Sequence, residues 1–279
     1  MNDTGCSFLP SQIPSKGWRK VSMGIVGSVF KLISMKHNIN LINKNKLIDS
    51  VFNRNGNKPM ITIMNHASVC DDTFILGHML PVSVLLNTNR MRWTLTASDV
   101  CFTSPLMSKF FMSGQCIPVW RNIYSRETGD LMMHGLGVNQ PSMNYSLDIL
   151  NSGGWINLYP QGKIVYGFET LKEETLRLKW GVGRLISECK EKPIIIPLWH
   201  CGMEQICPVV KPYWFTTFLS QMAKKKVTIM IGDRIQLPDQ LYKLSSSKET
   251  WAKITQHIQD SFYDLRQQTI RAHQKFLLN

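Results

Sequence analysis

A histidine and two aspartates stand close together in the stretch N-H-A-S-V-C-D-D, residues 65–72. An imidazole held by a carboxylate is the usual arrangement of a general base, because the carboxylate fixes one ring N–H and leaves the other nitrogen free to accept a proton. Residues five apart lie about 140° apart around an α-helix, so His66 and Asp71 cannot share a face of one continuous helix. We therefore predict His66 in a turn that follows a strand, and Asp71 in the first turn of a helix that starts near Ser68.

The same stretch has two other interpretations. Ser68-x-x-Asp71 resembles a capping box with Asp in place of Glu or Gln, in which case Asp71 only caps a helix and His66 is a turn residue. A metal site is the third alternative, although no further His or carboxylate lies nearby at ligand spacing. This window alone favours capping over catalysis.

Three later stretches place anion-binding groups at the ends of apolar runs. G-Q-C-I-P-V-W-R ends at Arg121, and Y-P-Q-G-K opens into a glycine turn at Gly162 followed by Lys163. Cations and turn glycines at the carboxyl ends of strands are what a phosphate-binding rim needs. The third stretch, I-I-I-P-L-W-H-C-G-M, contains His200, for which we predict a structural role, as we do for His78.

Short apolar runs rich in β-branched residues alternate with helical stretches along the chain. This alternation predicts an α/β fold with a mostly parallel central sheet flanked by helices. The predicted strands are 59–64, 116–120, 155–159, 194–199 and 227–232, and the predicted helices include 73–80, 171–190 and 247–276. Little periodicity is found over 122–144, which we predict to be a surface loop.

The charge balance predicts an anionic partner, since Lys plus Arg exceed Asp plus Glu by 32 − 19 = 13. No nucleic-acid motif accompanies this charge, so we favour an anionic membrane surface or a phosphorylated substrate and expect no nucleic acid. No uncharged apolar run reaches the roughly 18–20 residues of a simple membrane span, and no cleavable presequence is legible. We therefore expect a protein that lies on the membrane. The candidate embedding segments are 21–35, 100–112 and 212–222, the last followed by Lys224, Lys225 and Lys226.

Residues 17–36 are the best candidate for an interfacial helix, with apolar residues along most of its length and lysines toward anionic head groups. The alternative is an ordinary amphipathic helix that covers a core. We expect four segments: an N-terminal tail (1–16), an interfacial membrane helix (17–40), a catalytic domain (41–246) and a C-terminal amphipathic helix (247–279). The last carries one apolar stripe, for a core or a partner: Trp251, Ile254, Ile258, Phe262 and Leu265.

Taken in order, the motifs N-H-x-S-x-x-D-D, G-x-C-x-P-V-x-R, [FY]-P-x-G-K and I-I-x-P-L-W-H-x-G-M resemble those of the glycerophospholipid acyltransferases. The resemblance runs from about residue 17 to about residue 236. It implies a monotopic O-acyltransferase that moves a fatty acyl group onto the free hydroxyl of a lysophospholipid and needs neither metal nor cofactor. It implies His66 as general base, Asp71 as its orienting partner, and a substrate phosphate at Arg121, Gly162 and Lys163. The remaining motif positions are Asn65, Asp72, Gly114, Pro160, Gln161 and Pro197.

The branch of this family that the chain resembles most works without coenzyme A. The resemblance therefore implies acyl exchange among phosphatidylcholine, cardiolipin and monolysocardiolipin, on the outer and inner mitochondrial membranes facing the intermembrane space. In one motif the family has F-P-E-G, whereas this chain has Gln161 in place of the glutamate. Two alternatives stay open: an acyl-CoA-dependent lysophospholipid acyltransferase that uses the same residues, and a catalytically weak lipid-binding paralogue.

Overall fold

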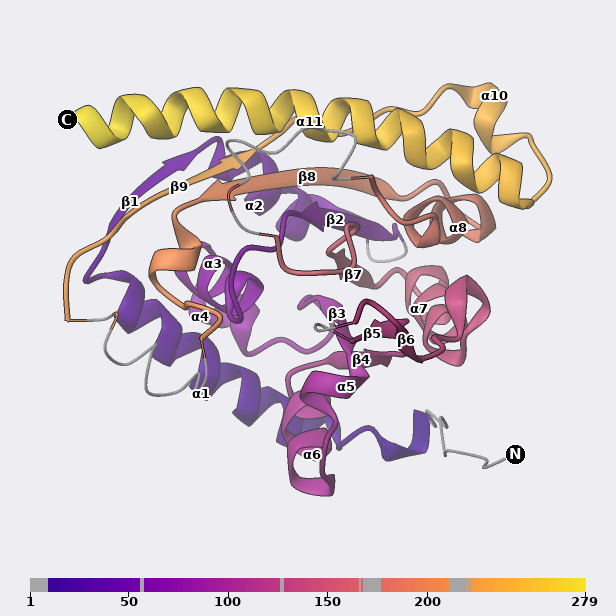
Figure 1. The fold of residues 1–279 in the computed structure, drawn as a ribbon, viewed down its shortest axis with the longest axis horizontal. Coiled ribbons are helices and arrows are strands. Elements are labelled where there is room, and N and C mark those ends of the chain that lie inside the picture. Colours follow the sequence, from indigo (N-terminus) through magenta and orange to yellow (C-terminus); the bar gives the residue numbers. More distant parts are fainter. Residues whose placement is uncertain are drawn as a thin grey trace.

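The computed structural model describes residues 10–55, 58–125, 128–165, 167, 177–210, 220 and 222–279. Seven strands form one sheet in the order β1-β9-β8-β2-β7-β3-β4, with helices on both faces (Figure 1). Neighbouring strands run parallel except for the antiparallel pair β8 and β9. The predicted α/β fold with a mostly parallel sheet is confirmed. The strands are β1 (Asn38–Ile42), β2 (Met60–Met64), β3 (Trp93–Ala97), β4 (Cys116–Val119), β7 (Trp155–Leu158), β8 (Ile194–Cys201) and β9 (Lys226–Ile231).

The sheet separates two hydrophobic cores, because successive side chains of a strand point to opposite faces. In β2, Ile61 and Ile63 belong to one core, and Met60 and Met64 belong to the other. Burial on both faces explains why this strand is an almost continuous apolar run in the sequence. The first core lies under α7 (Pro141–Asn151), α8 (Gly181–Glu188) and α11 (Lys248–Leu278), and the second under α1 (Lys16–Ser34), α2 (Lys44–Asn53), α3 (Asp71–Met79) and α4 (Val82–Leu85).

The long C-terminal helix α11 packs on α8, β8 and β9 (Figure 1). All five residues of its predicted apolar stripe are buried, so the stripe is a core-docking face. The helix is capped by Ser247, whose Oγ accepts a hydrogen bond from the amide of Thr250 at 3.2 Å. Helix α8 approaches α11 closely at Gly183, where a Cβ would lie 2.1 Å from the carbonyl oxygen of Trp251.

Helix α1 packs one face against α3 and α4. Gly24 and Gly27 permit this approach, since a Cβ at these positions would meet the side chains of Leu86 and Leu85. The opposite face carries exposed apolar residues at helical spacing, here called the α1 stripe: Trp18, Val21, Ile25, Val29, Leu32 and Met35. In the described part of the chain, no helix is both long and apolar enough to cross a bilayer.

Several elements differ from those predicted. Residues 38–42 form the edge strand β1, so the helix that we expected to reach residue 40 ends at Ser34. Strand β3 was not predicted, and the segment 122–144 is not only a loop. It contains the antiparallel hairpin β5 (Ile123–Tyr124) and β6 (Leu131–Met133), the turn η2 (Gly137–Asn139) and the start of α7.

The remaining elements are η1 (Pro10–Gln12), α5 (Ser98–Cys101), α6 (Pro105–Ser113), η4 (Met203–Gln205) and α10 (Asp239–Tyr242). Within the described residues of the predicted helix 171–190, helical structure covers only α8. Two predictions fall partly outside the described residues: positions 171–176 of that helix, and positions 212–219 and 221 of the candidate embedding segment 212–222.

Candidate active site

The parallel strands β2, β7, β3, β4 and β8 bring their carboxyl ends to one edge of the sheet. Asn65 and His66 follow β2, Tyr159 follows β7, and His200 stands near the end of β8. Residues far apart in the sequence therefore meet at this edge, here called the carboxyl edge. Open α/β sheets place their ligands outside this end of the strands.

His66 and Asp71 form a hydrogen-bonded pair, with Nδ1 of His66 2.7 Å from Oδ2 of Asp71. The same oxygen accepts hydrogen bonds from the amides of Ala67 at 2.8 Å and Ser68 at 3.0 Å, and Oδ1 accepts one from Oγ of Ser68 at 2.5 Å. Asp71 is buried, whereas the His66 side chain keeps 22% of its exposure. No residue of the described chain bonds Nε2 of His66. The carboxylate is thus fixed by four donors, and the imidazole retains one nitrogen for a substrate.

The start of α3 differs from the prediction. The helix begins at Asp71 and not near Ser68, and Cys70, at the N-cap position, makes no side-chain capping bond. The bond from the Ser68 amide to the Asp71 carboxylate is still the one that a capping box would contain. The carboxylate that pairs with His66 therefore also holds the turn before α3 through the Ser68 amide, but it does not cap the helix.

The surroundings of Asp71 stabilise its ionised form. Burial favours the neutral acid, but the His200 imidazole and the hydrogen bonds from His66 and Ser68 lower the pKa of Asp71 below its ordinary value. Burial in turn lowers the pKa of His200, with the nearby Asp71 opposing it. An anionic Asp71 is the state that holds a proton on Nδ1 of His66 and leaves Nε2 as an acceptor.

Tyr159 was not predicted to take part in the site. Its ring stacks on the imidazole of His66, with the centroids 4.0 Å apart and the planes at 21°. Its hydroxyl accepts a hydrogen bond from the amide of Asp72 at 2.9 Å. Burial and the charge of Asp72 raise the pKa of Tyr159 well above its ordinary value, so the phenol stays neutral. Tyr159 is the first residue of the motif Y-P-Q-G-K, and this position at a strand end was the feature of the sequence that could have indicated its part in the site.

The neighbouring Asp72 has a separate set of partners. Its Oδ2 lies 2.8 Å from Nε of Arg92 and accepts a hydrogen bond from Oγ1 of Thr94 at 2.7 Å, while Oδ1 accepts one from Oγ1 of Thr73 at 3.1 Å. Arg92 also donates to the carbonyl of Gly114 at 2.9 Å. Asp72 therefore joins α3 to β3, and the two adjacent aspartates have different partners.

Asn65 and His200 connect the ends of β2 and β8. The Asn65 amide donates to the His200 carbonyl at 3.0 Å and accepts from the His200 amide at 2.9 Å, and Nε2 of His200 lies 2.9 Å from the Asn65 carbonyl. His200 is 1% exposed, as a structural residue would be. His78 likewise has a structural contact, between its Nδ1 and Oγ of Ser34 at 2.9 Å. Pro197 lies within β8, opposite Ile63 of β2.

The predicted phosphate-binding residues are spread along the carboxyl edge. Arg121 follows β4, which lies three strand spacings from β2, or about 14 Å. Its guanidinium binds Asp99 in a bidentate pair at 3.0 and 3.1 Å. Gly162 has a φ of +71°, and both it and Lys163 are exposed in the turn after β7.

The other motif positions lie in two places. Pro160 is buried, and its carbonyl accepts a hydrogen bond from the amide of Lys179 at 2.7 Å. Gln161 is 3% exposed, and neither atom of its side-chain amide has a hydrogen-bond partner among the described residues. Gly114 caps α6 at the amino end of β4, and so it lies at the opposite edge of the sheet from His66. No cluster of three potential metal-binding side chains occurs among the described residues.

The sequence model of the acyltransferase family matches residues 37–201, which is more than half of the chain. A tafazzin of Drosophila melanogaster is 37% identical over 270 residues, 94% of this chain and 65% of that protein. A protein of Dictyostelium discoideum named taffazin is 34% identical over 211 residues, 74% of this chain and 66% of that protein.

An N-acylphosphatidylethanolamine synthase of Arabidopsis thaliana is 33% identical over 166 residues, 60% of this chain and 52% of that protein. The chain thus spans slightly less than two thirds of the length of the first two relatives. The matched region contains His66, Asp71, Arg121 and Gln161. The chain belongs to the acyltransferase family, and within that family it is similar to tafazzins.

Proposed function

We propose that the protein is a phospholipid–lysophospholipid transacylase. The observation that carries this proposal is the pair of His66 and Asp71 at the carboxyl edge, with the carboxylate buried and Nε2 of the imidazole left for a substrate. Membership of the acyltransferase family supports acyl transfer, and the names of the two tafazzin relatives support phospholipids as substrates.

In the proposed mechanism, Nε2 of His66 takes the proton from the free hydroxyl of a lysophospholipid. The resulting oxygen nucleophile attacks the ester carbonyl of a donor phospholipid, and the tetrahedral intermediate then expels the glycerol oxygen of the donor. The imidazolium returns its proton to that oxygen, so the enzyme is unchanged. One ester is broken and one is formed, and the reaction therefore runs near equilibrium in either direction. Asp71 holds the imidazole in the required tautomer and stabilises the imidazolium.

We further propose that Arg121, Gly162 and Lys163 contact the substrate phosphate. Arg121 is already oriented by Asp99, so its guanidinium would approach a phosphate in a fixed position. Lys163 and the turn at Gly162 extend beyond β7, the strand next to β2 in the sheet. The half-buried Arg121 and the exposed Lys163 on this edge are suited to an anionic head group.

The proposed lipids are phosphatidylcholine, cardiolipin and monolysocardiolipin, on mitochondrial membranes facing the intermembrane space. Pulling an acyl chain of roughly seventeen carbons into water costs about 14 kcal/mol at about 0.8 kcal/mol per CH₂, so the enzyme has to act where its lipid lies. The α1 stripe supplies an exposed apolar surface for this contact. We therefore place α1 in the interfacial region of the membrane.

Transfer in the absence of coenzyme A tests the proposal. The purified full chain is mixed with cardiolipin-containing vesicles, phosphatidylcholine labelled in its acyl chain, and unlabelled lysolipid. We expect label to appear in the lysolipid acceptor without any thioester. Transfer that starts only when acyl-CoA is added would replace the proposal with the acyl-CoA-dependent alternative.

The same assay separates the enzyme from a lipid-binding paralogue. Background-level transfer by wild type, with lysolipid binding retained, would favour the paralogue. Phosphatidylethanolamine is included as a second acceptor, because one relative is named for N-acylation of this lipid. Label recovered only as an amide would assign the N-acylation chemistry to this chain instead.

Gln161 provides a prediction that separates binding from stability. Its buried amide has no hydrogen-bond partner in the described part of the chain, and a buried polar group without a partner costs roughly 1–3 kcal/mol. Gln161→Leu is therefore expected to leave the free energy of unfolding unchanged or raise it by about 1 kcal/mol. We propose that the unpartnered amide contacts bound substrate, so the same variant should lower kcat/KM about tenfold. Thermal unfolding and initial rates check both parts. A variant that loses stability and keeps full kcat/KM would show a purely structural amide.

The α1 stripe provides a prediction about membrane binding. Ile25 and Leu32 are 61% and 68% exposed, so replacing both with Glu should not affect the core. Burial of each apolar side chain is worth about 1.5–3 kcal/mol, and the double variant is expected to bind anionic vesicles at least tenfold more weakly. Vesicle sedimentation measures the effect. Leu244→Glu, at an exposed apolar residue beyond α10, is the matched control. Equal loss of binding in both proteins would contradict the assignment of α1.

A further inference from the structure

A second site lies at the amino edge of the sheet, opposite the carboxyl edge. A pocket of about 680 Å³ opens there beside Trp93 and Trp155, the first residues of β3 and β7. The rest of its wall comes from the start of α1, the end of α2 with Arg54 after it, the loop 87–91, and α7 with the turn 152–154. His66 follows the opposite end of β2, so the sheet separates this pocket from the candidate active site.

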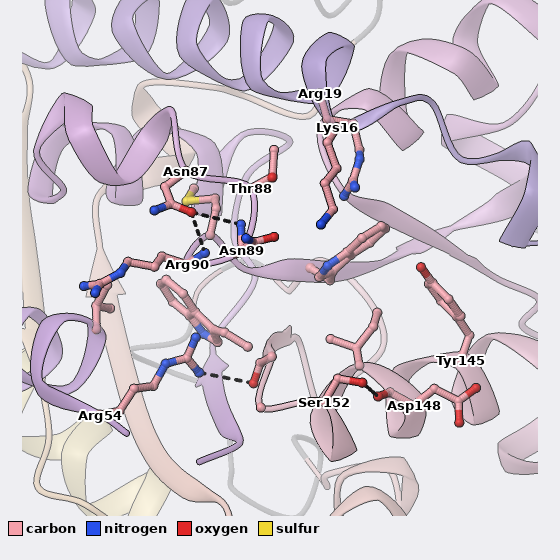
Figure 2. Close-up of a pocket in the computed structure, with 17 residues that line it drawn as sticks. Lys16, Arg19, Arg54, Asn87, Thr88, Asn89, Arg90, Tyr145, Asp148 and Ser152 are labelled. Carbon is pink, nitrogen blue, oxygen red and sulfur yellow. Dashed lines mark hydrogen bonds between the residues drawn. The ribbon is translucent and has the colours of Figure 1, made fainter. Parts of the chain in front are cut away.

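The pocket carries an excess of positive charge. Lys16 and Arg19 extend from α1 on one side, and Arg54 lies across from them (Figure 2). Arg90 is the fourth cation, and Asp148 is the one carboxylate among the lining residues. We call this set the basic pocket. Within the described part of the chain, none of its four cations forms an ion pair with a carboxylate.

The arginines of the basic pocket are held by neutral groups. Arg19 donates to the Pro14 carbonyl at 3.1 Å and to Oε1 of Gln115 at 3.0 Å, and its guanidinium lies 5.0 Å from the centroid of the Trp93 ring. Arg54 donates to the Gly154 carbonyl at 3.2 Å. Carbonyl and amide oxygens orient these side chains and leave their charges uncompensated.

Arg54 is the cation of the basic pocket whose environment disfavours its charge most clearly. Burial and the neighbouring Arg90 lower the pKa of the Arg54 guanidinium to about 10. A protein that keeps cations close together without a counter-ion stabilises any anion that enters between them. The basic pocket is thus arranged to receive negative charge.

The lining indicates the kind of anion. Guanidinium groups bind phosphate in a bidentate manner, and the pocket is larger than a phosphate alone requires. Apolar side chains beside the cations suit an attached organic group, and the concave shape does not suit an extended polyanion. The apolar lining residues are Val51, Met91, Trp93, Ile149 and Trp155.

We propose that the basic pocket binds the phosphate group of a small organic ligand, either the head group of an anionic phospholipid or a soluble organic phosphate. Binding there does not depend on acyl transfer, because the pocket shares no residue with the candidate active site. Helix α1 contributes Lys16 and Arg19 to the pocket and also carries the α1 stripe. A ligand in the pocket therefore fixes the start of the helix that we place at the membrane.

Calorimetric titration of the full chain tests the proposal with two probes, glycerol 3-phosphate and short-chain dihexanoyl phosphatidic acid below its micellar concentration. We expect binding that weakens as salt rises. Similar affinities for both probes would identify a soluble phosphate as sufficient, and binding of the phosphatidic acid alone would identify a lipid head group. Either result supports a phosphate site.

The variant Arg54→Gln/Arg90→Gln is expected to bind at least tenfold more weakly. Arg271→Gln, which removes an arginine of α11, and His66→Ala are both expected to bind as wild type does. No binding of either probe to wild type at millimolar concentration, or unchanged binding by the double variant, would overturn the proposal. If the double variant fails to fold, Arg90→Gln alone gives the test, because Arg90 is exposed.

Discussion

Replacing His66 by alanine is expected to lower kcat for acyl transfer about 10²- to 10⁴-fold, which is the contribution of a positioned general base. The imidazole offers the nitrogen that accepts the hydroxyl proton, and the alanine variant has no base in that position. Initial rates at saturating lysolipid measure the loss. His257→Ala is the matched control. This histidine lies on α11 and contacts the carbonyl of Gln236 through its Nε2, so the rate of the variant should equal that of wild type.

Asp71→Asn tests the same pair through the charge of the carboxylate. Oδ2 of Asp71 accepts hydrogen bonds from Nδ1 of His66 and from the amides of Ala67 and Ser68, so the asparagine oxygen should take its place and the NH2 group should face Oγ of Ser68. The negative charge that stabilises the imidazolium is then lost, and we expect kcat to fall about 10²-fold or more. The binding of lysolipid should change little. Activity within tenfold of wild type in a folded Asp71→Asn protein would remove Asp71 from the mechanism.

The fold was predictable where local pattern and burial agree. The strands β2, β7, β8 and β9 are buried on both faces, so their apolar runs are visible without any knowledge of their neighbours. Strand β1, with the sequence N-I-N-L-I, lies at the sheet edge and is only half-buried. Its apolar run is therefore short and interrupted, and it was not predicted from the sequence. The antiparallel pairing of β8 with β9 depends on contacts between distant segments, and no short window records them.

The site was predictable only in its local part. His66 and Asp71 are five residues apart, and one turn followed by one helix start is enough to join them. The stacking of Tyr159 on His66 and the pairing of Arg121 with Asp99 depend on the order of strands across the sheet. These contacts need the tertiary structure, and they decide what surrounds the base.

Asp72→Asn is expected to destabilise the protein by about 3–5 kcal/mol, because it leaves the buried charge of Arg92 without its counter-ion. Burial opposes the charge of Arg92, and Asp72 offsets this by raising its pKa. When the carboxylate is removed the guanidinium is still cationic, because the ordinary pKa of arginine lies far above neutral pH. The folded fraction should retain kcat. The hydrogen bond to the Tyr159 hydroxyl comes from the backbone amide of residue 72, which the substitution does not change. Chemical denaturation and rates per folded molecule check the two parts.

Two controls decide whether this loss comes from the buried ion pair. Asp239→Asn breaks an exposed pair with Lys192 and should leave the unfolding midpoint unchanged. The double variant Asp72→Asn/Arg92→Met should recover most of the stability, because both charges are then absent. A native unfolding midpoint for Asp72→Asn combined with a kcat as low as that of Asp71→Asn would contradict this division of roles. It would place Asp72, and not Asp71 alone, in the catalytic machinery.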